Sequence, residues 1–554
     1  MKTRLGGHSM IDRRQFVVRG SATVGAIVSG TGAILSAAGT AFAAEEKATP
    51  GATVETTAGK LRGVKLGNVQ AFKGVPYGAS TAPPNRFLPP KKPKPWTGVR
   101  DASELGKRSP QLLSAFHGFV PPEVEAMDRD EPLSEDCLML NVWTPGVGAS
   151  GKRPVMVWLH GGGYTSGSGG FICYDGAQLA GKHDVVVVTV NHRLSVFGYL
   201  YLAGIGGEHY ADASNVGNLD IIAALEWVRD NIAAFGGDAS NVTLFGQSGG
   251  AGKVSTLLAM PKAKGLFHRA IIQSGAAVRG MPKEAANKVA EEFLKRVSIT
   301  AKDIDKLQTL SMEQVLATTE TSKGPPLDTA PVVDGRTLPA DPFDPAAPAQ
   351  SADIPVIIGT TETEVTFFPN QILDPIDDAK LHASVKQQLR KASDAQVDQV
   401  IAAYRKGRPR DTNTDLYLII SSDATFRAGV LMEADRKAQQ KAAVYQYYFT
   451  WRSPVREGKL RSFHTLEIPF VFDNVDGAQS MTGKGQDRYA LADRMAKAWA
   501  AFARSGDPNH PGLPKWGTFD TKQRATMVFD NECRVVNDPH GEEQRLLRSV
   551  LSAS

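Results

Sequence analysis

The chain has 554 residues and a formal net charge of +5, and 42% of its residues are hydrophobic. This length and composition exclude a disordered chain and are sufficient for a sizeable buried core. Residues 1–43 alone carry a charge of +4, so the remainder is close to neutral, and the basic balance does not indicate a nucleic-acid partner.

Residues 1–43 have the layout of an export signal. Arg13-Arg14 precede a weakly apolar stretch rich in Gly and Ala, and Ala41-Phe42-Ala43 supplies the small residues that a signal peptidase reads. We predict a bacterial twin-arginine signal peptide over 1–43 and a mature chain, 44–554, that is periplasmic or secreted. The alternative is a membrane anchor, which the scarcity of Leu and Phe disfavours. No later segment has about 20 unbroken apolar residues, so we expect no stable membrane anchor in the mature chain.

Short apolar runs alternate with helical stretches through the mature chain. The runs are rich in β-branched residues and end at Gly, Asn or Ser, which is typical of strands buried on both faces of a parallel sheet. They are 155–159, 185–190, 242–245, 270–272 and 355–358. Helices are expected at 219–235, 253–260 and 489–504. The alternation predicts an α/β domain with a large, mostly parallel, twisted central sheet flanked by helices.

Residues from about 280 to 350 interrupt this alternation. The stretch 282–321 is helical in pattern and has no strand signal, and 325–348 is rich in proline. We expect a mainly helical insertion that forms a lid or a pocket wall, within one domain spanning 44–554.

The cysteines do not form a recognisable framework. There are three, Cys137, Cys173 and Cys533, so at least one is unpaired even in an oxidising compartment. No Cys/His cluster has metal-ligand spacing, and we predict no metal site.

One sharp turn carries the strongest chemical motif. Phe245–Gly250 contains the only G-x-S-x-G match in the chain, with Ser248 at its centre, between an expected strand and an expected helix. In that context the motif holds a serine hydroxyl at the apex of a strained turn, where it acts as a nucleophile. We predict Ser248 as the nucleophile; the alternative is a glycine-rich loop without chemistry.

A run of glycines follows the expected strand at 155–159. The glycines in His160-Gly161-Gly162-Gly163-Tyr164 let backbone N–H groups approach a ligand closely. An acyl-transfer enzyme needs such donors where the tetrahedral oxyanion forms. We predict Gly162, Gly163 and Gly249 as the oxyanion hole, because an H-G-G-G run upstream of G-x-S-x-G has this role. The alternative is a flexible turn, and His160 is expected to be structural.

A serine nucleophile needs a general base, and the base needs an orienting carboxylate. In this kind of fold the acid follows a later strand and the histidine comes after it. Glu362 and Glu364 both follow the expected strand at 355–358, and the pattern alone does not choose between them. The histidines beyond them are His382, His464, His510 and His540. His464 stands just before an apolar run, which makes it the candidate base.

Together these motifs resemble the type-B carboxylesterases, a family that includes the cholinesterases. The resemblance covers roughly residues 54–519, and Ser134–Trp143 is similar to the family's S-E-D-C-L-x-L-N-V-W segment. It implies the α/β-hydrolase fold. The family's acid pattern falls on Glu364, and its H-x-x-E/D segment falls on His464 with Glu467.

The resemblance also implies details around this triad. Phe367-Phe368 match aromatic residues that line the family's active-site gorge. Two structural ion pairs are implied, Arg86 with Glu135 and Arg193 with Asp220.

The chain departs from the family pattern at several positions. Gln247 and Gly249 stand where the family usually has Glu and Ala, and Val365 stands where it has Gly. The cysteine that would pair with Cys137 is missing, with Ser109 about where it would be, so we expect that disulfide to be absent. Residues 109–136 contain no Trp, which disfavours choline esters because a Trp there holds the quaternary ammonium in cholinesterases.

The expected activity is hydrolysis of a small-molecule carboxylic ester through an acyl-enzyme on Ser248, with no cofactor. Two alternatives remain. Amide hydrolysis or acyl transfer would use the same triad, and a non-catalytic binding protein would use the same fold without the chemistry. The substrate and the oligomeric state are not indicated by the sequence.

Overall fold

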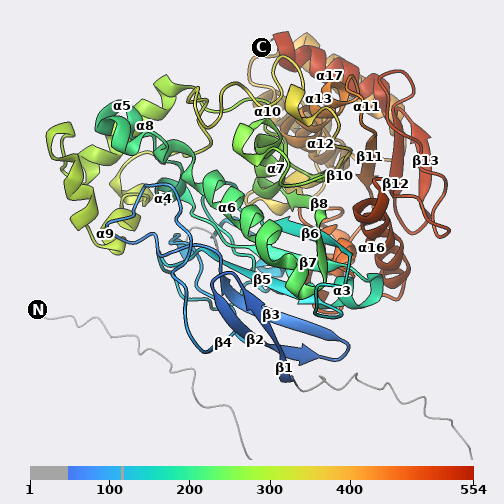
Figure 1. Ribbon diagram of the computed structural model, residues 1–554. Helices are drawn as coiled ribbons and strands as arrows, with labels where there is room; N and C mark the ends of the chain where they lie inside the picture. Colours follow the sequence, from blue (N-terminus) through green and yellow to red (C-terminus); the bar gives the residue numbers. More distant parts are fainter. Residues whose placement is uncertain (1–47, 114–117, 554) are drawn as a thin grey trace, which may run out of the picture. The chain divides into compact units, whose positions relative to one another are not determined.

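A computed structural model describes residues 48–113 and 118–553 (Figure 1). The predicted signal peptide lies outside the described residues. At the centre is a 13-stranded sheet with the order β1-β2-β3-β5-β7-β6-β8-β9-β10-β11-β12-β13, and β4 pairs with β2. The strands span Thr49–Thr56 (β1), Gly59–Leu66 (β2), Val69–Pro76 (β3), Val99–Asp101 (β4), Met139–Thr144 (β5), Arg153–Leu159 (β6), Val186–Val190 (β7), Gly237–Gln247 (β8), Arg269–Gln273 (β9), Val356–Thr361 (β10), Val444–Phe449 (β11), Ala525–Phe529 (β12) and Arg534–Asn537 (β13).

The middle of the sheet is parallel. The strands from β7 to β12 in the sheet order pair parallel, whereas β1, β2, β3 and β5 at one edge and β13 at the other pair antiparallel along this order. The five apolar runs of the sequence are β6 to β10, so the predicted mostly parallel α/β sheet is confirmed. Parallel strands buried on both faces need no polar alternation, which is why these runs are continuously apolar.

Helices cover both faces of the sheet. The helices span Pro122–Glu125 (α2), Ala177–His183 (α3), Ser195–Tyr199 (α4), Ala203–Gly206 (α5), Val216–Asn231 (α6), Gly249–Ala259 (α7), Lys283–Arg296 (α8), Met312–Ala317 (α9), Asp378–Gln388 (α10), Asp394–Gly407 (α11), Asn413–Ser422 (α12), Ala428–Lys437 (α13), Ile468–Val471 (α14), Gln479–Thr482 (α15), Asp487–Ser505 (α16) and Gly541–Ala553 (α17). None of those among the described residues is both long and apolar enough to cross a membrane.

Strand β6 shows how the two faces are divided. Met156 and Trp158 belong to one core, with α3, α14 and α16, while Val155 and Val157 belong to the other, with α6, α7 and α13. Successive side chains of a strand point to opposite faces, so one run of apolar residues serves both cores. Figure 1 shows α16 and α6 on different sides of the strands.

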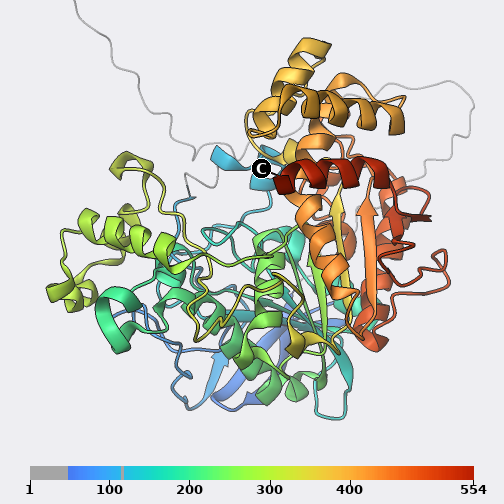
Figure 2. The same ribbon diagram turned by 90° about the horizontal axis from the view of Figure 1, so that it is seen from above.

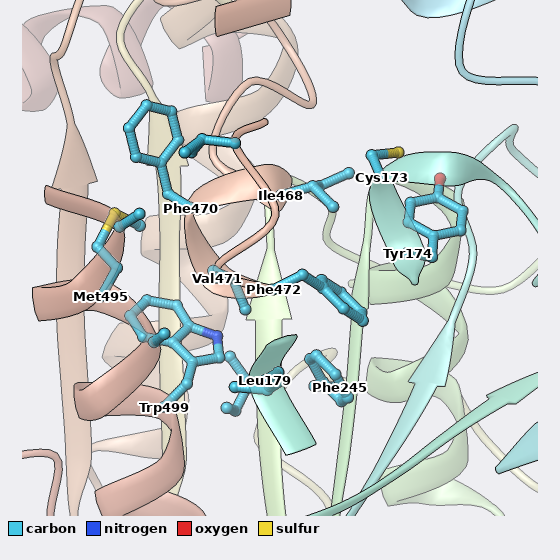
Figure 3. Packing of buried hydrophobic residues seen from close by; sticks show 14 of the residues in the cluster. Cys173, Tyr174, Leu179, Phe245, Ile468, Phe470, Val471, Phe472, Met495 and Trp499 are labelled. Atoms are coloured by element: carbon cyan, nitrogen blue, oxygen red, sulfur yellow. The ribbon is translucent and has the colours of Figure 1, made fainter. Parts of the chain in front are cut away.

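The core beneath α16 also includes helix α14 and the residues just before it. Phe472 stacks on Phe245 of β8 with ring centroids 5.6 Å apart, and Trp499 of α16 lies nearby (Figure 3). Phe463 and Leu466, which flank His464, are fully buried in the same core. The apolar run that follows His464 therefore anchors this histidine to the sheet.

The segment at about 280–350 contains α8, a 3₁₀ segment Ala301–Thr309 and α9, and it joins a separate apolar cluster with Phe87 and Phe197. A second helical region, α10 to α12 between β10 and β11, packs with the C-terminal α17 around its own cluster. The two regions lie apart in Figure 2, one lime and one gold. The second region was not predicted from the sequence.

The two ion pairs implied by the resemblance are present and buried. Arg86 holds Glu135 through two hydrogen bonds of 2.6 Å each, and Arg193 holds Asp220 at 2.6 and 2.8 Å. The three cysteines, Cys137, Cys173 and Cys533, are buried and free.

Candidate active site

Ser248 occupies the turn between β8 and α7. Its φ of +57° and ψ of −126° form a backbone conformation that residues other than glycine rarely adopt. A Cβ on Gly250 would lie 2.0 Å from the carbonyl oxygen of Leu159, and one on Gly246 would lie 2.6 Å from the carbonyl carbon of Gly250. Both glycines are therefore required for β6, β8 and α7 to close around Ser248, as the motif predicts.

The glycine turn after β6 lies opposite this serine. Gly162 and Gly163 have φ values of +90° and +60°, and both line the same cavity as Ser248. Among the described residues, the amides of Gly162, Gly163 and Gly249 donate no hydrogen bond within the chain. Free backbone donors beside a serine suit a developing oxyanion.

His160, before the glycine turn, is part of the scaffold. It is buried and stacks on His192 with ring centroids 4.9 Å apart, and its Nδ1 lies 2.8 Å from the carbonyl oxygen of Gly161. Burial, with the nearby Lys253 ammonium, lowers the pKa of His160 to about 3. A ring that stays neutral and does not line the cavity at Ser248 agrees with the structural role expected for it.

The second pair of predicted residues is in direct contact. Nδ1 of His464 lies 2.5 Å from Oε2 of Glu364, and the other carboxylate oxygen accepts a 2.8 Å hydrogen bond from the amide of Thr361. Both side chains are buried, at 1% and 0% exposure. Glu362 points elsewhere, because its carboxylate pairs with Arg408 and Arg452. The sequence pattern did not choose between Glu362 and Glu364. The contact with His464 makes Glu364 the candidate acid.

The other histidines that followed Glu364 in the chain are engaged elsewhere. His382 lies 3.4 Å from Asp398, His510 bonds the carbonyl of Arg494, and His540 lies 3.3 Å from Glu543. None of the three lines the cavity at Ser248.

The structure brings Ser248 and His464 to one cavity but does not join them. Among the described residues there is no hydrogen bond between the two side chains, and the side-chain Nε2 of Gln247 lies 3.2 Å from Nε2 of His464 instead. Hydrogen bonds of catalytic groups are often long before substrate binds.

Aromatic rings enclose the imidazole of His464. The ring centroids of Phe426, Phe367 and Phe368 lie 4.7, 5.3 and 5.8 Å from it. Phe426 stands on a π-helical turn, Asp423–Arg427, beyond the second helical region, and it was not predicted from the sequence. No local motif surrounds this residue, so nothing in the sequence marked it.

The cavity has a volume of about 450 Å³ and a mainly apolar lining. Its aromatic lining comes from Phe119, Phe171, Tyr174, Phe367 and Phe368. The 280–350 segment contributes one wall, through Leu316, Thr319, Pro326, Leu327 and Asp328. This segment therefore does reach the pocket, as a pocket wall was expected to.

Comparison with known proteins agrees with this geometry. A sequence model described as "Carboxylesterase family" matches residues 50–546. The chain belongs to the type-B carboxylesterase family. The para-nitrobenzyl esterase of Bacillus subtilis (strain 168) is 35% identical over 505 residues, covering 89% of this chain and 98% of that protein. The human cocaine esterase is 31% identical over 510 residues, covering 87% of this chain and 88% of that protein.

Solved carboxylesterase structures share the fold. Carboxylesterase EST55 of Geobacillus stearothermophilus is 37% identical, with a TM-score of 0.77, and the match covers 89% of this chain and 99% of that chain. An esterase from Clostridium hathewayi, described as able to hydrolyse aliphatic aromatic polyesters, is 32% identical with a TM-score of 0.78 over 91% of this chain and 100% of that chain. The α/β-hydrolase fold implied by the resemblance is thereby confirmed.

This carboxylesterase carries a second buried carboxyl beside the acid–base pair. Glu467 has 0% exposure, and its only hydrogen-bond partner among the described side chains is Gln273, at 3.3 Å. Burial, followed by the charge of Glu364, raises the pKa of Glu467 to about 8. At neutral pH the group is therefore mainly protonated, so it adds little negative charge beside the Glu364–His464 pair.

Proposed function

We propose that this carboxylesterase is a serine hydrolase of carboxylic esters that forms an acyl-enzyme on Ser248. The observation that carries the proposal is the buried contact of His464 with Glu364 at the wall of the cavity that Ser248 lines. Membership of the carboxylesterase family supports the reaction class.

In the proposed mechanism, His464 takes the hydroxyl proton of Ser248 as its oxygen attacks the ester carbonyl. Glu364 holds the imidazole through Nδ1 and stabilises the imidazolium. The alcohol leaves with the proton from His464 as the C–O bond breaks. Water then attacks the acyl-enzyme by the same route, releasing the acid and restoring the serine.

The tetrahedral intermediates of both steps carry a negative oxygen. The N–H groups of Gly162, Gly163 and Gly249 are proposed to bind it, since they are free of partners within the described chain. Removal of one such donor costs about 10²–10³ in kcat in related chemistry.

The cavity lining favours an apolar or aromatic substrate. Aromatic rings of this kind bind apolar groups through large contact area and edge-to-face contacts. The relatives named for para-nitrobenzyl and cocaine esters support aromatic esters as test substrates. The absence of a Trp in the 109–136 sequence argues against choline esters, as above.

Turnover of chromogenic esters tests the proposal. The purified protein is assayed with p-nitrophenyl acetate, butyrate, octanoate and laurate beside Ser248→Ala, which should lose about 10⁶-fold in kcat. The matching p-nitroanilides separate ester from amide hydrolysis. Steady anilide turnover with negligible ester turnover would favour the amidase alternative, and an inert but folded chain would favour the binding protein.

Export is a separate proposal. We propose that residues 1–43, outside the described part of the chain, direct twin-arginine export. A chain carrying Arg13→Lys and Arg14→Lys should accumulate in the cytoplasm of a host whose twin-arginine system is intact. Unchanged export of that variant would contradict the proposal.

A further inference from the structure

A fully buried lysine lies directly behind the oxyanion turn. Lys253 has 0% exposure on α7, and it forms no ion pair among the described residues. Its Nζ donates a 2.7 Å hydrogen bond to the carbonyl oxygen of Gly163 and lies 5.0 Å from the centre of the Tyr164 ring. Its hydrogen-bond partner is thus the backbone of the turn whose glycines line the cavity at Ser248.

The same carbonyl fills the space of a missing methyl group. A Cβ on Gly249 would lie 2.0 Å from the oxygen of Gly163 and 2.5 Å from its carbonyl carbon. Alanine, the residue that the family usually has at this position, is therefore incompatible with the turn as it stands. Gly249 and Lys253 are four residues apart on α7, so they share one face of the helix and act on the same carbonyl.

The turn needs such an anchor because its own residues are glycines. The carbonyl of Gly162 accepts hydrogen bonds from the amides of Thr165 and Ser166, at 3.2 and 3.1 Å, which hold the peptide that carries the Gly163 N–H. On the other side of Gly163, the peptide carbonyl is held by Lys253. Glycine gives up more conformational freedom than any other residue when it is fixed, so both anchors are needed to aim this N–H.

We propose that Gly249 and Lys253 form a coupled device that positions the Gly163 amide of the oxyanion turn: the missing methyl admits the carbonyl of Gly163 and the lysine binds it. Lys253 is a positioning residue, since it acts through the turn rather than on the substrate. The proposal rests on the proposed function, because it concerns the oxyanion hole of that reaction.

The burial of this lysine supports a role beyond folding. Burial lowers the pKa of Lys253 to about 7, so the folded protein resists the charged form of this side chain. The other titratable groups around it, His160, His192 and Tyr164, are not anions that would offset this cost. An unpaired buried ammonium is costly for stability, and a methionine of similar volume would serve the core better.

Replacement of the lysine by methionine is the first test. Lys253→Met keeps the apolar stem and removes the donor, so we expect kcat for p-nitrophenyl butyrate to fall about 10- to 100-fold with KM changed less than threefold. Lys437→Met is the matched control. Lys437 is also buried and bonds the carbonyl of Ser351, and burial lowers its pKa to about 8, but it lies outside the cavity lining. That variant should keep kcat whatever its thermal stability.

A double-mutant cycle tests the coupling. Gly249→Ala alone should displace the carbonyl of Gly163 and lower kcat by a similar factor. Combined with Lys253→Met it should cost little more, because the contact is already lost. Circular dichroism and thermal melting establish that each variant is folded.

The outcomes separate this inference from the proposed function. If the native chain hydrolyses esters and Ser248→Ala does not, the proposed function stands, and the variants at 249 and 253 are then informative. A Lys253→Met variant with native kcat, or single-variant losses in kcat that multiply in the double variant, would overturn the coupled device. If the native chain itself turns over no ester, the proposed function is wrong, and the inference about Gly249 and Lys253 is wrong with it.

Discussion

The two sides of the site are held in different ways. On the nucleophile side, Ser248 and the oxyanion turn are fixed by close backbone approaches that only glycine allows, such as Gly250 against Leu159. On the acid–base side, His464 and Glu364 are fixed by buried side-chain contacts and aromatic rings. Substitutions that add atoms should therefore disrupt the nucleophile side. Substitutions that remove polar atoms should disrupt the acid–base side.

The largest expected effect is on the acid–base side. His464→Ala removes the proposed general base, and we expect kcat for ester hydrolysis to fall about 10⁶-fold, as for other triads that act as a unit. His382→Ala, on α10 and outside the cavity lining, is the control and should retain native kcat. Comparable activity of the two variants would remove His464 from the mechanism.

Glu362 and Glu364 are two residues apart in the chain but bind different partners. Glu364→Gln should lower kcat about 10⁴-fold, since the amide no longer holds the imidazole in its working tautomer. Glu362→Gln should keep kcat while lowering the melting temperature, because it loses its pairs with Arg408 and Arg452. Steady-state kinetics and melting curves measure both, and the reverse pattern would assign the acid to Glu362.

One added methyl group should be enough to disrupt the packing on the nucleophile side. Gly250→Ala places a Cβ 2.0 Å from the oxygen of Leu159, so β6 and α7 must separate and Ser248 must move. A misplacement of about 1 Å can cost on the order of 10² in rate, so we expect at least that loss in kcat, with a lower melting temperature. Gly517→Ala is the control, because its Cβ would meet Ala525 at an ordinary 3.8 Å. A fully active Gly250→Ala variant would contradict the backbone-packing account.

The smallest effect concerns the pH dependence of stability at Glu467. Burial, and then Glu364, raises the pKa of Glu467 to about 8 from its ordinary 4.5, so the folded chain binds more protons than the unfolded chain between these values. The stability contributed by this proton is full below the unfolded pKa and is lost as pH rises through about 8. Glu467→Gln lacks this loss, so the melting temperature of the variant, relative to that of the native chain, should increase from pH 5 to pH 9. A constant difference across this range would contradict the raised pKa.

The nucleophile side and the acid–base side also differ in how far the sequence predicts them. The place of Ser248, Gly162 and Gly163 on sharp turns after strands could be predicted from the sequence, because neighbouring residues make those turns. The choice between Glu362 and Glu364 could not be made from local pattern without the resemblance. The two glutamates are told apart by partners that reach them only in the folded chain: His464 contacts Glu364, and Arg408, 46 residues beyond Glu362, binds Glu362.

Some elements of the fold could be predicted from the sequence and others could not. The runs that became β6 to β10 were recognisable because burial on both faces makes a strand continuously apolar. Phe426, which lies against the ring of His464, was not, because it reaches the ring from a helical region whose position no periodicity gives. Lys253 carried no mark of its own, since a charged residue early in a predicted helix ordinarily faces solvent.

Covalent titration identifies the nucleophile, which we propose is Ser248. Diisopropyl fluorophosphate transfers its phosphoryl group to an activated serine oxygen with loss of fluoride, and peptide mass spectrometry locates the label. We expect one equivalent to be bound, on the peptide containing Ser248, with ester hydrolysis lost in proportion to labelling. Full ester hydrolysis after complete labelling of Ser248, or inactivation with the label on another residue, would contradict it.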